Sequence, residues 1–296
     1  MSSETLPSQP KLSTPASNRV AIITPIYRTH LSDQEHYAIR HILYHLSNYP
    51  KFIIAPDTLQ ITITGFETIS FSAHYFAGIA GYNQLMLSPS FYQTFATFDY
   101  ILICQLDALI LSDRLQTFCD LGYDYIGSPW FASSEDPNRG FIGCGNGGLS
   151  LRHVQHFLDV LQSDEFDKLP FYKKLWRVMT HPYGDMLSEA FHMRLLKKLN
   201  IFRQIHHGLA HYIHTYKWNE DRFWGLRVPM FYPSFKIAPI EIGLDFAFEM
   251  FPDWSLQHNH HQLPFGCHAW WRYGADFWRP YLIDQVDFIF DAHERT

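Results

Sequence analysis

The stretch DYILICQLDALIL, residues 99–111, decides the fold of this chain. Five apolar residues, Tyr100 to Cys104, form a run that is typical of a buried strand, and Gln-Leu-Asp follows it directly. An unpaired carboxylate inside such a strand would cost several kcal/mol. We therefore expect Asp107 either to leave the strand at its exit and face a cleft, or to have a strong partner such as a metal ion.

The segments before this stretch alternate between strand and helix patterns. RVAIITPIY (19–27), KFIIAPD (51–57) and LQITITGF (59–66) are typical of strands, and DQEHYAIRHILYHLSNY (33–49) has the spacing of a helix. This order predicts an α/β, Rossmann-like fold with a mainly parallel central sheet flanked by helices. Ligands of such sheets bind beyond the carboxyl ends of the strands.

The segments after it continue the alternation. Residues 112–122 and 153–163 predict helices, residues 123–130 predict a strand, and a further helical pattern runs from about Asp185 to Asn200. The last part, residues 228–296, is aromatic, broken by prolines and expected to be irregular. With no linker after residue 18, we expect one domain over 19–296, preceded by a disordered polar tail over 1–18.

Composition limits the class of protein. The chain has 296 residues, 47% of them hydrophobic, and a net charge of −6 without any lysine/arginine block, which argues against nucleic-acid binding. The four cysteines have no regular spacing, and the N-terminus has no export signal, so we expect reduced thiols and a cytoplasmic location. We expect no membrane span and find no basic amphipathic helix in the sequence; peripheral membrane contact stays open.

Two motifs offer a ligand site, and each has a structural alternative. Asp107 at a strand end is suited to a divalent cation that bridges phosphate oxygens, but a capping or salt-bridged aspartate fits equally. In GCGNGGLSL, Gly143, Gly145, Gly147 and Gly148 allow the backbone to approach a ligand closely, or form a packing turn. The order of glycines is not GxGxxG, and no Walker-type lysine follows, so a P-loop is excluded.

Two further motifs carry titratable groups. Asn219-Glu220-Asp221 puts two acids at an expected helix start, where they cap the helix or provide a general base. His268, within LPFGCHAWW, is a metal ligand or a packed core residue. The spacing of His207, His211 and His214 would put them on one helix face, but no HExxH motif is present, so a metal-dependent hydrolase remains a minority interpretation.

The order of these pieces is more informative than any one of them. YILICQLDALIL, YIGSPWF, GNGGLSLR, NED and PFGCHAW together resemble the pattern of a family of uncharacterised glycosyltransferase-like proteins, over roughly residues 20 to 271. That family is in turn similar to nucleotide-sugar transferases with the GT-A fold. The resemblance implies a GT-A-like fold and an enzyme that moves a sugar from a nucleotide-diphosphate sugar to a glycan, a lipid-linked saccharide or another hydroxyl acceptor.

The resemblance also implies roles for individual residues. Gln105-Leu106-Asp107 would take the place of the DxD motif, and Asp107 and His268 would bind Mn²⁺ or Mg²⁺. Asp221 would be the catalytic base and Glu220 its partner, which binds acceptor or sugar hydroxyls. The remaining expected donor-site residues are Pro25, Tyr27, Asn146, Gly147 and Gly148. Because Gln105 replaces the first acid of DxD, metal binding should be weaker, and metal-independent transfer stays open.

These assignments describe an inverting displacement. A metal ion would neutralise the departing nucleoside diphosphate while Asp221 deprotonates the acceptor hydroxyl. Exposed rings would suit a sugar acceptor, and the expected set is Trp130, Trp218, Trp224, Trp270 and Trp271. The alternatives are the hydrolase above and a carbohydrate-binding protein of the same fold without catalysis.

Overall fold

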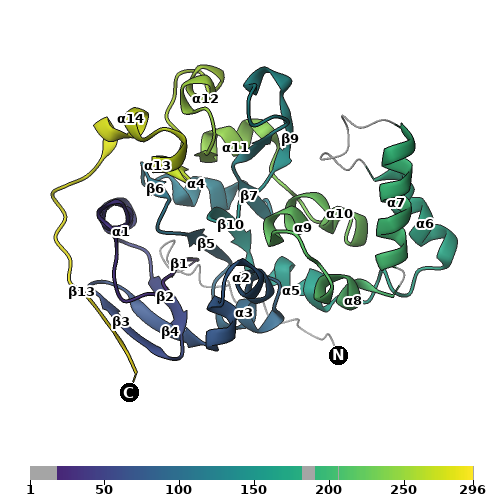
Figure 1. Ribbon diagram of the computed structural model, residues 1–296, viewed down its shortest axis with the longest axis horizontal. Helices are drawn as coiled ribbons and strands as arrows, with labels where there is room; N and C mark the ends of the chain where they lie inside the picture. The colour runs from purple at the N-terminus through teal and green to yellow at the C-terminus, as the bar shows by residue number, and fades with distance from the viewer. Residues whose placement is uncertain (1–18, 182–190, 206, 296) are drawn as a thin grey trace, which may run out of the picture.

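The computed structural model describes residues 19–181, 191–205 and 207–295 (Figure 1). The disordered tail expected over residues 1–18 lies outside these ranges. So does the first part of the helix expected from Asp185, whose remainder lies in α7 (Phe191–Ile205).

The centre of the molecule is a six-stranded sheet with the order β4-β2-β1-β5-β10-β7. The strands, in that order, are Glu67–Phe71, Lys51–Pro56, Val20–Pro25, Tyr100–Cys104, Leu149–His153 and Tyr125–Gly127. Strand β10 is antiparallel to both its neighbours, and the other three pairings are parallel. The predicted α/β class with a mainly parallel central sheet flanked by helices is therefore confirmed.

Alternate side chains of β1 enter two different hydrophobic clusters, as the two-residue period of a strand requires. Ala21 and Ile23 pack with residues of α2, α3, α5 and α9, whereas Val20 and Ile22 pack with residues of α1 and α4. Helices thus cover both faces of the sheet. Their bounds are Ile79–Met86 (α2), Pro89–Thr94 (α3), Val154–Gln162 (α5), Glu220–Leu226 (α9), Asp33–His45 (α1) and Leu115–Asp120 (α4).

The first helix begins where the sequence signals a helix start. The Ser32 side chain accepts from the Glu35 backbone N–H, and the Glu35 side chain accepts from the Ser32 backbone N–H, which together form a capping box. This arrangement fixes Glu35 at the edge of the sheet beside Arg28, with which it forms an ion pair.

One strand was expected in the central sheet and is found elsewhere. Strand β3 (Leu59–Ile63) pairs antiparallel with the C-terminal strand β13 (Phe290–Glu294), and β4 takes its place beside β2. The exposure of β3 alternates along its length, unlike the continuous burial of β1, because β3 has one solvent-facing side. The continuation of the central sheet by β4 was not foreseen.

Residues 228–296 were expected to be irregular, which is wrong, because they form several short elements. They are α10 (Val228–Phe231), α11 (Ile240–Phe246), β11 (Ala247–Phe248), α12 (Pro252–His258), β12 (Gly266–Cys267), α13 (Trp270–Tyr273), α14 (Ala275–Trp278) and β13. Strand β6 (Leu109–Ile110) joins β12 and β11 in a small sheet, and β8 (Pro129–Phe131) pairs with β9 (Phe141–Cys144). The expected strand at 123–130 is therefore two strands, β7 and β8.

The remaining helices form the edge seen at the right of Figure 1. They are α6 (Phe171–Thr180), α7 and α8 (Leu209–His214). Helix α6 is both basic and amphipathic, so the expectation that the chain contains no such helix is wrong. None of the helices in the described ranges is long and apolar enough to cross a bilayer. All four cysteines are buried free thiols.

Candidate functional site

The predicted site residues come from five separate parts of the sequence and line one cavity of about 730 Å³. They are Pro25, Tyr27, Gln105, Asp107, Asn146, Gly147, Gly148, Glu220, Asp221 and His268. Ligand pockets commonly measure roughly 300–1,000 Å³, so this cavity can hold a molecule of nucleotide size. The fold thus brings the ten residues together, and their chemical roles stay predictions.

Asp107 reaches the cavity because its strand ends just before it. Strand β5 stops at Cys104, and Leu106 is buried in a cluster of aliphatic side chains, so the carboxylate of the following residue can turn away from the core. The first of the two expectations for Asp107, a position at the strand exit facing a cleft, describes its place in the structure.

The small sheet of β6, β11 and β12 gathers three titratable side chains. Strand β12 is antiparallel to β6 and parallel to β11, with Cys267 opposite both Leu109 and Phe248. The next residue after β12 is His268, and the next after β11 is Glu249. The register therefore puts His268 next to both Asp107, which precedes β6, and Glu249.

His268 lies between two carboxylates. Its Nδ1 is 3.0 Å from Oε1 of Glu249, and its Nε2 is 3.2 Å from Oδ1 of Asp107. Burial by itself lowers the pKa of His268, but the two carboxylates outweigh burial and raise that pKa to about 10. Burial would raise the pKa of Asp107, and the adjacent His268 holds it below its usual value instead.

The pair formed by Asp107 and His268 fits a divalent cation. Oδ1 of Asp107 and Nε2 of His268 are buried and face each other at 3.2 Å, and neither atom has another hydrogen-bond partner among the described residues. Glu249 accepts from Nδ1 of the imidazole, the arrangement that leaves Nε2 as the metal ligand in many proteins. Imidazole and carboxylate together suit Mn²⁺.

Further ligands would have to come from the substrate. Within the described ranges, no group of three or more His, Cys, Asp or Glu side chains is arranged to hold a metal ion. A Mg²⁺ or Mn²⁺ ion bound by Asp107 and His268 would complete its shell with phosphate oxygens and water, as Mg²⁺ commonly does in proteins.

The glycine-rich loop is shaped by Asn146. Its Oδ1 accepts from the backbone N–H groups of Gly148 (2.7 Å) and Leu149 (2.9 Å), and its Nδ2 donates to Ser128 and Glu249. Because this buried side chain has all its bonds within the protein, Asn146 holds the loop and Glu249 in place. Asn146 also lines the cavity, and its expected role in the donor site stays a prediction.

The two glycines that follow allow the acidic pair and the histidine to approach the same short segment. A Cβ at Gly147 would lie 3.0 Å from Oε1 of Glu220, and a Cβ at Gly148 would lie 2.0 Å from Nε2 of His268. Since consecutive Cα atoms are about 3.8 Å apart, the Glu220 carboxylate and the imidazole flank one peptide unit. A side chain at Gly148 would occupy the place of the imidazole.

Glu220 and Asp221 occupy the first turn of α9, as expected for an acid pair at a helix start. Glu220 is fully buried, with Oε1 3.0 Å from the guanidinium of Arg152 and with Oε2 lacking a hydrogen-bond partner among the residues that the structure describes. Burial raises the pKa of Glu220 to about 7, against the opposing effect of Arg152.

Asp221 is the more accessible acid of the pair. Its side chain is partly buried, and its Oδ1 accepts from the backbone N–H of Arg222 (2.7 Å). Burial raises the pKa of Asp221, although this hydrogen bond opposes the shift. A carboxyl group with a raised pKa at a cavity wall is suited to proton transfer.

The end of β1 forms another wall of the cavity. Pro25 is the last residue of the strand, and Tyr27 is 57% exposed, so its ring is free to contact a ligand. The guanidinium of Arg28 lies 5.9 Å from the centre of the Tyr27 ring and is paired with Glu35, which lines the same wall.

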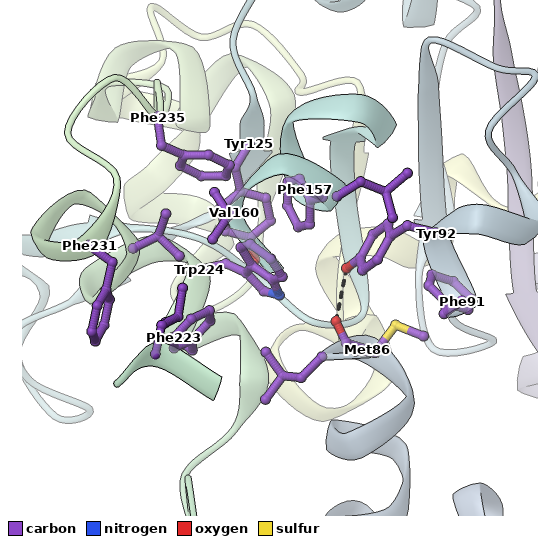
Figure 2. Packing of buried hydrophobic residues seen from close by; sticks show 14 of the residues in the cluster. Met86, Phe91, Tyr92, Tyr125, Phe157, Val160, Phe223, Trp224, Phe231 and Phe235 are labelled. Atoms are coloured by element: carbon purple, nitrogen blue, oxygen red, sulfur yellow. Dashed lines mark hydrogen bonds between the residues drawn. The ribbon is translucent and has the colours of Figure 1, made fainter. Parts of the chain in front are cut away.

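Only some of the tryptophans expected around an acceptor lie at the cavity. Trp130 and Trp271 line the cavity. Trp224 is fully buried in the aromatic core drawn in Figure 2, and Trp270 is 4% exposed, so the prediction is wrong for these two. Trp218 is exposed but is not part of the cavity lining.

The histidines behind the hydrolase interpretation do not form one helix face. Helix α7 ends at Ile205 and α8 begins at Leu209, so His207 lies between the helices while His211 and His214 lie on α8. The rings of His207 and His211 are 5.0 Å apart, and neither histidine lines the cavity.

Two residues of the site were missed in the sequence. Arg152 ends the motif GNGGLSLR, and an arginine in an otherwise apolar strand was a signal that it needs a buried partner. Glu249 had no such signal, because the strand before it has only two residues and shows no periodicity.

The chain is similar to the glycosyltransferase GlyE of Streptococcus pneumoniae TIGR4 (14% identity, 90% of this chain and 61% of that chain, TM-score 0.39). It is also similar to mouse xyloside xylosyltransferase 1 (10% identity, 83% of this chain and 96% of that chain, TM-score 0.39). A third similar structure is the galactosyltransferase LgtC in complex with donor and acceptor sugar analogs (11% identity, 90% of this chain and 98% of that chain, TM-score 0.44).

The chain thus spans about 61% of the length of GlyE. A search of curated proteins found no match. The model of the family described as "Protein of unknown function (DUF5672)" matches residues 65–268, which is more than half of the chain. This chain is therefore a member of the DUF5672 family.

Proposed function

We propose that this protein is a glycosyltransferase that moves a sugar from a nucleotide-diphosphate sugar to a hydroxyl group of a glycan or lipid-linked saccharide. The observation that carries the proposal is that one cavity contains two groups of side chains with different chemistry. A carboxylate and an imidazole that suit a cation flank the Gly147–Gly148 segment on one side, and an acidic pair flanks it on the other.

The donor would lie between β1 and the pair of Asp107 and His268. Tyr27 is exposed enough to stack on a nucleobase, and the guanidinium of Arg28, although paired with Glu35, lies at the same wall and can donate to phosphate oxygens. A bound Mn²⁺ or Mg²⁺ would act as a Lewis acid that neutralises the charge of the departing diphosphate. Gln105 contributes no charge, so this neutralisation would depend on Asp107 and His268.

The acceptor would be activated by Asp221. Its raised pKa makes it a stronger base than an ordinary aspartate, and an ionised Asp221 can take the proton of an acceptor hydroxyl. Glu220, held by Arg152 through Oε1, keeps its unpaired Oε2 for a sugar hydroxyl. Attack by a hydroxyl group on the face opposite the diphosphate would invert the anomeric centre.

The test is isothermal titration of the protein with UDP, GDP and CDP, with and without Mn²⁺, on the wild type and on Asp107→Ala. We expect one nucleotide to bind, more tightly with Mn²⁺, and the metal effect to disappear in Asp107→Ala. The matched control is Asp113→Ala, since Asp113 is exposed and outside the cavity. Absence of binding by all three nucleotides would contradict the proposal.

Catalysis is tested separately from binding. With the nucleotide identified, its sugar conjugates are incubated with the protein, and donor consumption is measured. Replacing a general base typically costs about 10²–10⁴-fold in rate, so Asp221→Asn should lose that much while it still binds the nucleotide. Nucleotide binding without donor consumption by the wild type would favour the carbohydrate-binding alternative.

A further inference from the structure

Helices α6 and α7 expose an unusual number of large apolar side chains. They lie together at the edge of the molecule, far from the strand pair of β3 and β13 (Figure 1). The exposed fractions are 63% for Phe171, 66% for Tyr172, 70% for Trp176, 44% for Met193, 59% for Leu196 and 46% for Leu199. We call these six residues the α6–α7 face.

The opposite sides of both helices are fixed to the rest of the protein. Val178 of α6 and Ile201 and Ile205 of α7 are buried in the large hydrophobic cluster. The guanidinium of Arg177 donates to the backbone carbonyl of Phe231. The buried sides attach both helices to the rest of the protein, so the hydrophobic core does not need the side chains of the α6–α7 face. None of its residues lines the cavity of the candidate site.

The same two helices concentrate positive charge. Helix α6 contains three lysine and arginine residues and α7 contains four, and neither helix contains an aspartate or glutamate. The whole chain has a net charge of −6, so these two helices have the opposite sign to the protein as a whole. A partner of this face should therefore be anionic.

We propose that the α6–α7 face binds the surface of an anionic lipid bilayer. Large apolar side chains next to lysine and arginine are the composition of helices that lie in the membrane interface. Tryptophan and tyrosine favour the headgroup level, where long cationic side chains can keep their charges near lipid phosphates. The proposal rests on exposure and charge, and it is independent of the chemistry of the cavity.

The experiment is co-sedimentation of the full chain with vesicles of phosphatidylcholine alone and of phosphatidylcholine mixed with phosphatidylglycerol. We expect binding to the mixed vesicles that weakens as salt is added. Basic residues near an anionic surface strengthen binding, so reversing the charge of Lys173 with Lys173→Glu should weaken binding about tenfold or more. Tyr172→Ser combined with Trp176→Ser should weaken it at least as much.

Two control variants match these changes in residue type and exposure. Tyr44 on α1 is 61% exposed, and Lys236 is exposed on a loop, and both lie outside the two helices. Tyr44→Ser and Lys236→Glu should bind mixed vesicles as the wild type does. Folding of every variant is checked by circular dichroism and thermal denaturation.

Two results would overturn the assignment. One is the absence of binding to mixed vesicles, or equal binding by the helix variants and the controls. The other is a dimer in light scattering that Tyr172→Ser with Trp176→Ser converts to a monomer, without any vesicle binding by the wild type. That second result would make another copy of this chain the occupant of the face.

Discussion

Arg152 and Glu220 are the residues on which the acidic wall of the cavity depends. Their side chains are 0% and 2% exposed, and the arginine also donates to the hydroxyl of Tyr92. Removing one partner of a buried ion pair leaves an unpaired charge, which costs about 3–5 kcal/mol. We expect Arg152→Met to lower the free energy of unfolding by about that amount at pH 8, where Glu220 is ionised.

Urea denaturation measures this effect, with Arg114→Met as the control. The pair formed by Arg114 and Asp245 has the same kind of contact, 2.8 Å, but each side chain is 36% exposed. Exposed pairs contribute about 0–1 kcal/mol, so the control should change little. Similar losses in both variants would mean that burial of Arg152 has no special consequence.

Glu220 should also make stability depend on pH in an unusual direction. Its pKa in the folded protein is about 7, above the ordinary value of 4.5, so between these values the folded state holds a proton that the unfolded state has lost. The free energy of unfolding should therefore fall as pH rises through this window, by up to about 3 kcal/mol.

The measurement is the free energy of unfolding of the wild type minus that of Glu220→Gln, followed from pH 4 to 8. Because other carboxyl groups titrate equally in both proteins, the difference isolates Glu220. We expect it to decrease with rising pH and to level off above pH 7. A flat difference would show that Arg152 keeps the pKa of Glu220 near its ordinary value.

At the scale of elements, the loop between β9 and β10 connects the two halves of the site. Its backbone at Gly148 passes so close to His268 that an added Cβ would overlap the imidazole, at 2.0 Å. We expect Gly148→Ala to displace the imidazole and to reduce Mn²⁺-dependent nucleotide binding about tenfold or more, since one of the two proposed protein ligands would move.

Gly147→Ala is the matched variant, one residue earlier in the same loop. Its Cβ would be 3.0 Å from Oε1 of Glu220 and 3.9 Å from Cβ of Asp221. It should therefore reduce donor consumption and leave the metal effect on nucleotide binding intact. Titration calorimetry and a turnover assay on both variants separate these effects. If both variants lose the same property, the loop does not divide the site as the structure indicates.

At the scale of the whole molecule, the C-terminal strand closes a cluster that begins near the N-terminus. Strand β13 pairs with β3, and Phe290 packs against aliphatic residues that include Ile26 and Leu106, next to the cavity walls. We expect Phe290→Ala to lower the free energy of unfolding by about 2 kcal/mol, measured in urea, because the burial of most of a large apolar side chain is lost.

Ile289→Ala is the control for this change. Ile289 is the neighbouring residue and is 70% exposed, so its replacement should change the free energy of unfolding by less than about 0.5 kcal/mol. An equally small effect of Phe290→Ala would mean that β13 adds nothing to the stability of the N-terminal half.

The sequence by itself determined the features that depend on neighbouring residues. Buried strands at Val20–Pro25 and Tyr100–Cys104, the first helix, and the acid pair at a helix start all follow from local periodicity, capping and charge. The cavity residues Asp107 and His268 were assigned through the resemblance of several short motifs, in their order along the chain, to those of a known family.

The tertiary structure alone decided the features that depend on register and on pairing between distant segments. Two-residue strands bring Glu249 to His268, 19 residues away, although nothing in such short segments shows periodicity. The partner of Arg152 is Glu220, 68 residues later. The place of β4 beside β2 is set by backbone pairing between the two strands. The sequence could not show that Trp224 is buried and Trp176 is exposed. Tryptophan occurs both in protein cores and on protein surfaces, and only the packing of distant segments decides where each one lies.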